Sequence, residues 1–333
     1  MTDVLPSTKP EKNKVVIAHR GASAYLPEHT LAAKAMAHAM GADFLEQDVV
    51  LSQDHIPLVL HDIYLDTVTN VHDRFPGRAR SDGRYYAFDF SMVEIKQLRV
   101  QERVDLTTQQ PVYPQRFPSG KSVFRVPTLA EEIELIQGLN RSTGQEAGLY
   151  PEIKSPSWHR RQGADISRIV LDCLSQYGYQ TAEDPIYVQC FDADETRRLR
   201  VELKTRLKLV QLIGENGWHE APTDFTYLRT PAGIAHVASY AEGVGLWLAH
   251  VMTGVDQHGK PMLTPLVETA HAHQLAVHAY TLRADDLPSY ATNFNQFIDY
   301  LVHHAEIDGV FTDFPDLAVS YLQRADQRLS RTK

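Results

Sequence analysis

The stretch that decides the fold runs from Val15 to Leu51 and reads VVIAHRGASAYLPEHTLAAKAMAHAMGADFLEQDVVL. Its first four residues, Val15–Ala18, and its last eight, Phe44–Leu51, are apolar runs of the kind that form buried strands. Between them, Thr30 to Met40 has helical spacing, and Gly41 is placed to end that helix. The apolar face of this helix is expected to comprise Leu31, Ala35, Met36 and Ala39. A strand, a helix and a second strand in this order predict a parallel βαβ unit.

The same alternation continues along the chain. Further strands are predicted at Leu58–Leu60, Leu149–Ile153, Ile186–Gln189, Lys208–Ile213, Gly243–Leu248, Leu275–Tyr280 and Gly309–Thr312. Helices are predicted between most of them, among others at Thr128–Leu139, Ile166–Leu174 and Thr264–His273. Eight of the nine strands would close a (β/α)₈ TIM barrel. Because Ser52–Pro57 is too short for a parallel crossover, the second and third strands are predicted to form a hairpin. An open doubly wound sheet is the alternative, but no glycine-rich nucleotide loop follows the first strand.

The stretch Asp62–Arg125 interrupts this alternation with turn-rich, aromatic and basic sequence. A loop of this length is expected to be an inserted subdomain over one mouth of the barrel. Residues 215–230 read as a smaller loop insertion. The domain organisation expected is therefore a polar extension at 1–14, one barrel domain at 15–325 that includes the 62–125 insertion, and a polar tail at 326–333.

Composition excludes several classes of protein. With 42 acidic and 33 basic residues, the chain has a net charge of −9 and no basic stripe for nucleic acid. The sequence has no run of eighteen apolar residues, so no stable membrane insertion is expected. The two cysteines, Cys173 and Cys190, are expected to be buried thiols, and a single disulfide is the alternative. Met1 to Lys14 has no apolar signal-peptide core.

Two histidines follow predicted strands, where barrel enzymes carry their catalytic groups. His19 is followed by Arg20 and Gly21 directly after the first strand. An imidazole beside a guanidinium suits phosphate chemistry. The imidazole can transfer a proton, and the guanidinium can bind two phosphate oxygens at once. His61 ends the third strand, and the predicted hairpin would place it opposite Gln47 or Asp48.

Three carboxylates and a lysine follow a strand periodicity. Glu46 and Asp48 are two residues apart in one strand and therefore share a face, as do Glu152 and Lys154 in the next parallel strand. Inside a barrel, such carboxylates would repel one another and raise each other's pKa unless a hard cation bound them. Lys154 would supply a point charge for phosphate.

Weaker candidates stand at the ends of later strands. They are Gln189, Phe191, His278, Tyr280, Arg283 and Asp313. Each is expected at the rim of the barrel, where it could line or brace the mouth.

With these residues in place, the chain resembles the glycerophosphodiester phosphodiesterase family, specifically its bacterial periplasmic type. The resemblance runs from about Val15 to about Leu322. Its motifs are His19-Arg20-Gly21, Leu26-Pro27-Glu28-His29-Thr30, Glu46-Gln47-Asp48, Val59-Leu60-His61-Asp62, Tyr150-Pro151-Glu152-Ile153-Lys154, Gln189-Cys190-Phe191-Asp192 and Phe311-Thr312-Asp313-Phe314-Pro315-Asp316. Each block alone is weak, and their joint occurrence in this order is specific.

The resemblance implies a TIM barrel with an insertion after the second catalytic histidine. It implies that His19 and His61 are the acid–base pair and that Arg20 and Lys154 lie near the phosphate. It also implies that Glu46, Asp48 and Glu152 bind a divalent cation, commonly Ca²⁺, with Mg²⁺ or Mn²⁺ as alternatives. Together with Gln189, Phe191 and Tyr280 at the rim, these residues form the expected site. The activity implied is hydrolysis of glycerophosphodiesters, the deacylated phospholipid headgroups, to sn-glycerol 3-phosphate and an alcohol.

Two other functions remain alternatives. One is a phosphodiesterase acting on intact phospholipids, and the other is a non-catalytic surface-binding protein on the same barrel. The expected partner is a small-molecule substrate, and a homodimer is left open. Location is expected to be cytoplasmic if the chain is full length and periplasmic if a signal peptide has been removed. His29 stands where many relatives have Asn, and little consequence is expected from that difference.

Overall fold

The structure is a computed structural model that describes residues 14–331, with side chains described for residues 14–325. The expected N-terminal extension at 1–14 lies almost wholly outside the described residues.

The strands are β1 (Val15–Ala18), β2 (Phe44–Leu51), β3 (Pro57–Val59), β4 (Gly148–Ile153), β5 (Tyr187–Cys190), β6 (Lys208–Ile213), β7 (Gly243–Trp247), β8 (Met252–Val255), β9 (Pro261–Leu263), β10 (Ala276–Leu282) and β11 (Gly309–Thr312). The α-helices are α1 (Leu31–Ala39), α2 (Val71–Arg74), α3 (Met92–Ile95), α4 (Leu129–Thr143), α5 (Pro156–Arg161), α6 (Ile166–Gln176), α7 (Ala193–Val201), α8 (Phe225–Leu228), α9 (Pro231–Val237), α10 (Leu248–Val251), α11 (Leu266–Ala272), α12 (Phe294–Asp299) and α13 (Pro315–Arg331). Short helices of other types lie at Ala87–Asp89, Asn216–Trp218 and Tyr300–His304.

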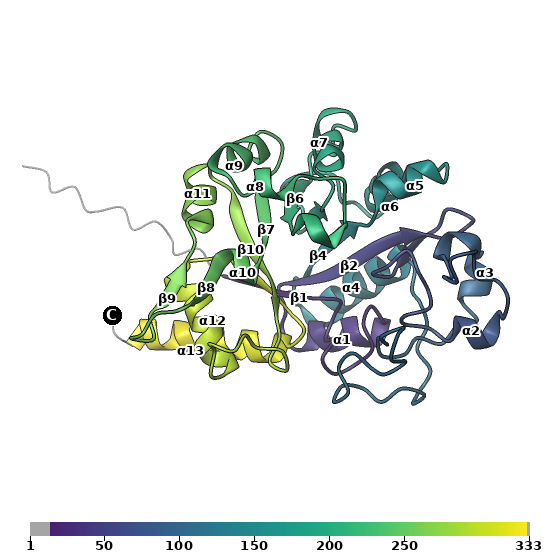
Figure 1. Ribbon diagram of the computed structural model, residues 1–333, viewed down its shortest axis with the longest axis horizontal. Coiled ribbons are helices and arrows are strands. Elements are labelled where there is room, and N and C mark those ends of the chain that lie inside the picture. The colour runs from purple at the N-terminus through teal and green to yellow at the C-terminus, as the bar shows by residue number, and fades with distance from the viewer. Residues whose placement is uncertain (1–13, 332–333) are drawn as a thin grey trace, which may run out of the picture.

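A closed parallel barrel forms the centre of the molecule, as the sequence predicted. Hydrogen-bonded neighbours run in the order β1, β2, β4, β5, β6, β7, β10 and β11, and β11 pairs with β1 again. Helices connect successive strands and cover the outside (Figure 1). Among the described helices, none has the length and apolar character needed to span a membrane.

The predicted hairpin is present, and its register brings His61 to the barrel. Strand β3 pairs antiparallel with β2, with Leu51 opposite Pro57 and Val49 opposite Val59. The amide of Leu60 then donates to the carbonyl of Asp48 over 2.8 Å. His61 therefore begins its loop beside the strand that carries the acidic residues.

The barrel interior is filled below the acidic residues by large side chains. Ile17, Tyr150, Val210 and Phe311 form a buried cluster of their own inside the ring of strands. The Tyr150 and Phe311 rings meet edge to face with centroids 5.0 Å apart. This packed layer closes the lower part of the barrel, so polar chemistry is confined to the carboxyl ends of the strands.

The 62–125 segment has its own hydrophobic core. Fourteen buried side chains form it, among them Leu65, Phe90 and Ile95. Strands β2 and β3 contribute Val50, Leu58 and Leu60 to the same cluster, which ties the segment to the hairpin. Its regular elements are short, and it lies at one side of the barrel beside β2 (Figure 1).

The expected apolar face of α1 was wrong. The buried side chains of α1 are Ala33, Lys34, Ala37 and His38, whereas Leu31 is 36% exposed. The helix therefore turns two polar side chains inward, and both have partners there, Lys34 on Glu132 and His38 on Asn140. At the other end of the chain, α13 continues to Arg331 and covers most of the polar tail at 326–333, because no proline or glycine follows Pro315 to end it.

Candidate active site

A cavity of about 240 Å³ opens where the barrel strands end. Nine of the ten predicted site residues line it: His19, Arg20, Glu46, Asp48, His61, Glu152, Gln189, Phe191 and Tyr280. The tenth, Lys154, lines an adjoining cavity, and its ammonium lies 2.9 Å from Glu152 Oε1. The structure therefore places the ten predicted side chains in two adjoining cavities at the same end of the barrel.

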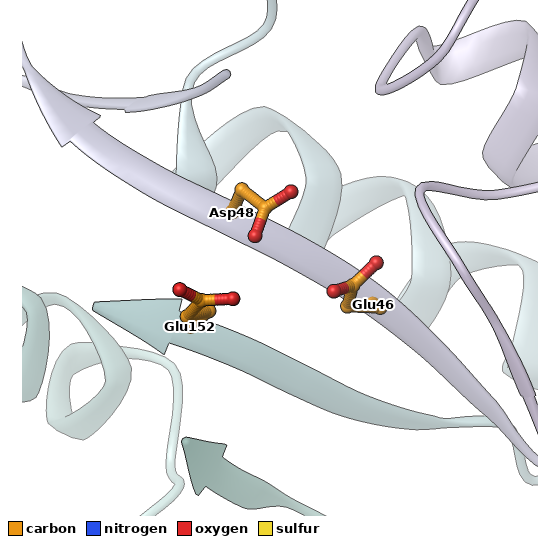
Figure 2. Close-up of side chains that lie close together, drawn as sticks. All are labelled: Glu46, Asp48 and Glu152. Carbon is orange, nitrogen blue, oxygen red and sulfur yellow. The ribbon is translucent and has the colours of Figure 1, made fainter. Parts of the chain in front are cut away.

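The three carboxylates of Glu46, Asp48 and Glu152 converge in the cavity. β2 pairs with β4 so that Asp48 lies opposite Glu152, and Glu46 precedes them on the same face (Figure 2). One oxygen of each lies within 4.8 Å of the others, and all three residues are buried. Burial raises the pKa of Glu152 to about 8, and burial together with Asp48 raises that of Glu46.

The cluster fits a divalent cation. Among the described side chains, Asp48 Oδ1 and Gln189 Oε1 are buried without a hydrogen-bond partner, so ligand oxygens are available. Gln189 reaches the cluster through Nε2, which donates to Glu46 Oε1 over 3.3 Å. An all-oxygen set of this kind suits hard cations such as Ca²⁺, Mg²⁺ or Mn²⁺.

The two histidines have matching surroundings. His19 Nδ1 lies 2.6 Å from Asp313 Oδ1, and His61 Nδ1 lies 2.7 Å from Asp62 Oδ1. In each neutral ring the proton is therefore on Nδ1 and the lone pair is on Nε2. Burial and Arg20 lower the pKa of His19 to about 4, and the same causes lower the pKa of His61. Both rings can accept a proton at neutral pH.

Arg20 has an uncommon backbone conformation that joins it to the carboxylate cluster. Its φ is +59°, and its amide donates to Glu46 Oε2 over 2.7 Å. Its guanidinium contacts Glu28 at 3.0 Å and lies 3.5 Å from Asp48. Gly21, the next residue, packs on helix α1. Its φ is +89°, and a Cβ there would lie 2.8 Å from the Ala33 carbonyl carbon.

Aromatic side chains form the opposite wall. Phe191 and Tyr280 meet edge to face with centroids 6.0 Å apart, and Tyr280 Oη donates to the Ile213 carbonyl. Trp218 and Trp247 add a second pair at 5.2 Å. One side of the cavity is thus charged and the other largely apolar. His278, a weaker candidate, lies deeper in the barrel, where its Nδ1 is 2.7 Å from Tyr150 Oη.

A buried polar chain behind the cluster was missed. Lys34 is fully buried, and its Nζ contacts Glu132 Oε2 at 2.8 Å, His29 Nδ1 at 3.4 Å and the carbonyl of Glu46. His29 Nε2 lies 2.7 Å from Asp48 Oδ2. The position of His29 was expected only to shape the loop before the first helix, but its ring also contacts Asp48, a predicted metal ligand. The one feature of the sequence that could have indicated this buried network is Lys34 itself, which stands in an alanine-rich helix.

Comparisons of the sequence with known proteins point to one family. A sequence model of the Glycerophosphoryl diester phosphodiesterase family matches residues 19–317. A glycerophosphodiester phosphodiesterase of Haemophilus influenzae is 42% identical, over 96% of this chain and 92% of its own length. Another from Treponema pallidum is 37% identical, over 93% and 92%.

Solved structures share the fold. A putative glycerophosphoryl diester phosphodiesterase from Silicibacter pomeroyi superposes with a TM-score of 0.71 at 23% identity, covering 95% of both chains. A phosphodiesterase from Oleispira antarctica, in complex with its product sn-glycerol-3-phosphate, has a TM-score of 0.62 at 21% identity, covering 93% of this chain and 96% of that one. With the family match spanning most of the sequence, the chain belongs to the glycerophosphoryl diester phosphodiesterase family.

Proposed function

We propose that this chain hydrolyses glycerophosphodiesters to sn-glycerol 3-phosphate and an alcohol, with His19 and His61 as the acid–base pair. The observation that carries the proposal is that both histidines direct Nε2 away from a carboxylate partner and line the cavity that holds the acidic cluster. The family match and the named activity of the relatives support the same substrate class.

The charges of the cavity suit a phosphodiester only when the carboxylates are neutralised. Glu46, Asp48 and Glu152 would hold a divalent cation, proposed to be Ca²⁺, whose chemistry there is to polarise a non-bridging phosphate oxygen. Arg20 and Lys154 add positive charge beside the same oxygens. One imidazole removes the proton of the attacking hydroxyl, and the other, which must first be protonated on Nε2, donates that proton to the leaving alcohol oxygen. Such positioned proton transfers contribute ~10²–10⁴-fold in rate.

The other side chains of the cavity have supporting parts in this proposal. Gln189 orients Glu46 through the hydrogen bond from its amide. Phe191 and Tyr280 provide an apolar wall against which the carbon skeleton of the substrate packs.

The first experiment measures release of glycerol 3-phosphate from glycerophosphocholine by the purified protein. We expect EDTA to abolish the activity and Ca²⁺ to restore it more fully than Mg²⁺ or Mn²⁺. His19→Ala and His61→Ala should each lower kcat by ~10²–10⁴-fold, whereas His258→Ala, at an exposed turn, should not. Near wild-type activity in either catalytic variant would refute the role of that residue. No turnover by the folded wild type, with any of the three cations, would refute the proposed function.

We also propose that the chain is of the periplasmic type. The resemblance of its motifs to that type supports the proposal. Fractionation of the source cells, followed by assay of each fraction, tests it, and activity confined to the cytoplasmic fraction would refute it.

A further inference from the structure

The carboxylate behind each candidate catalytic histidine has a second oxygen, and an arginine from the 62–125 segment binds it. Asp313 Oδ2 accepts from Arg116 Nη2 over 2.8 Å, and Asp62 Oδ2 accepts from Arg103 Nη1 over 2.6 Å. Each imidazole is thus the end of a His–Asp–Arg chain. One chain links residues that lie almost three hundred positions apart in the sequence.

Both arginines also bind carboxylates at the barrel rim. Arg116 makes a bidentate ion pair with Asp285, with N···O distances of 2.9 and 3.0 Å. Its guanidinium also lies 3.7 Å from the centroid of the Tyr113 ring. Arg103 makes a similar pair with Glu28, at 2.6 and 3.1 Å. Asp285 follows β10, and Glu28 lies in the loop between β1 and α1, so these contacts join the segment to two loops of the barrel rim. Two-pronged pairs fix the plane of a guanidinium as well as its position.

The two His–Asp–Arg hydrogen-bond networks differ in the number of arginines that support the carboxylate. Asp313 Oδ2 also accepts from Arg283 Nε over 2.7 Å, so a barrel arginine supports it as well. Asp62 Oδ2 has only the hydroxyl of Thr67, at 3.1 Å, beside Arg103 among the described residues. Among the described residues, loss of Arg103 therefore leaves Asp62 with no arginine or lysine partner, whereas loss of Arg116 leaves Arg283 at Asp313.

We propose that Arg103 and Arg116 are positioning residues through which the 62–125 segment sets the orientation of both catalytic imidazoles. This rests on the proposed function, because it gives His19 and His61 the acid–base role. A carboxylate held at both oxygens cannot rotate about its Cβ–Cγ bond, and the imidazole that it binds keeps Nε2 directed into the cavity. The segment is then part of the catalytic apparatus and more than a cover over the barrel.

The variants Arg103→Met and Arg116→Met test this, with Arg80→Met as the matched control. Arg80 lies in the same segment and pairs with Asp89 in the same two-pronged way, at 2.7 Å for each contact, without touching either chain. Changes of residues that orient a functional group from behind cost about 10–100-fold. We expect kcat to fall within that range for Arg103→Met and by less for Arg116→Met. Arg80→Met should change kcat by less than twofold, and Arg103→Lys should recover part of the loss.

Two readouts separate positioning from a structural role. Circular dichroism should show that the Arg103→Met and Arg80→Met variants are both folded at the assay temperature, with the lower melting temperature in Arg103→Met because Arg103 pairs with two largely buried carboxylates. The Nδ1 protons of His19 and His61 should give low-field NMR signals, assigned through the histidine-to-alanine variants. The His61 signal should move or broaden in Arg103→Met and stay unchanged in Arg80→Met.

The outcomes are decisive for the inference. Equal kcat losses in Arg103→Met and Arg80→Met, or an unchanged His61 signal in Arg103→Met, would overturn it. A loss expressed only in KM would also overturn it, because that would place the effect on substrate binding through Glu28 and Arg20. The NMR measurement needs no turnover. It therefore tests the inference even if the wild type hydrolyses no glycerophosphodiester and the proposed function fails.

Discussion

Replacing Lys34 by methionine should destabilise the protein strongly and weaken cation binding at the same time. The Lys34 ammonium and the Glu132 carboxylate are both 0% exposed and lie 2.8 Å apart. Methionine keeps the length of the side chain but leaves Glu132 without a cation. Breaking a buried pair in this way costs ~3–5 kcal/mol.

The loss of stability should depend on pH. Burial raises the pKa of Glu132 to about 7 even with Lys34 present, and its removal would raise this pKa further. A carboxyl whose pKa is raised in the folded state stabilises the fold below its unfolded pKa, and this contribution is lost as pH rises. The cost of Lys34→Met should therefore be largest near pH 8 and decrease by up to ~1.4 kcal/mol per pH unit towards pH 6.

Cation binding should weaken for a separate reason. Lys34 also contacts His29 Nδ1 and the Glu46 carbonyl, and His29 in turn holds Asp48. Loss of such supporting contacts lowers metal affinity by about 10–100-fold. The double variant Lys34→Met/Glu132→Gln removes the unpaired charge, so it should regain most of the stability but not the affinity.

Urea unfolding measures the stability and isothermal titration with CaCl₂ measures the affinity. The matched control is Lys96→Met, whose partner Glu131 is the neighbour of Glu132 in α4. That pair is 34% and 41% exposed, so its loss should cost less than ~1 kcal/mol. A cost below ~1 kcal/mol for Lys34→Met at pH 8 would refute the buried-pair reasoning. Full recovery of Ca²⁺ affinity in the double variant would refute the supporting role.

Three further outcomes follow from the structure. Because burial raises the pKa of Glu152 to about 8 without a cation, Ca²⁺ should raise the melting temperature more at pH 8 than at pH 5. Calorimetry of Ca²⁺ binding in buffers of different ionisation enthalpy should show that protons are released. Equal shifts of the melting temperature at both pH values would contradict this. Phe90→Ala, in the buried core of the 62–125 segment, should lower the free energy of unfolding in urea by ~3–5 kcal/mol. Val93→Ala, at a side chain that is 74% exposed, should change it by less than ~0.5 kcal/mol. Equal effects would contradict the separate core. Gly21→Val should lower the melting temperature, because its φ of +89° and the Ala33 backbone leave no room for a Cβ, and a melting temperature equal to that of the wild type would contradict that packing.

The parts of the site that could be predicted depend on short-range regularities. The two-residue spacing of Glu46 and Asp48 places them on one face of a strand, and the short turn at 52–57 fixes the hairpin that carries His61. Parallel pairing of β2 with β4 then brings Glu152 opposite Asp48. Each of these steps needs only strand geometry.

The parts that could not be predicted depend on distant partners. Lys34 pairs with a residue 98 positions away in the sequence. The spacing of apolar residues in a helix cannot show that a lysine lies on its buried face. Arg116 and Asp313 are 197 positions apart, so the support of His19 appears only when the barrel closes. The β8–β9 hairpin was also not expected, because its strands of four and three residues carry little periodic signal.

The closure of the barrel between β1 and β11 has a consequence for synthesis of the protein. Glu46, Asp48 and Glu152 all leave the ribosome in the first half of the chain, whereas Asp313 directly follows β11, the last strand of the ring. A nascent chain can therefore contain every ligand of the acidic cluster and still lack the partner of His19. Because the proposed mechanism needs His19, we expect a chain released before β11 is made to lack hydrolytic activity even though its acidic cluster is complete.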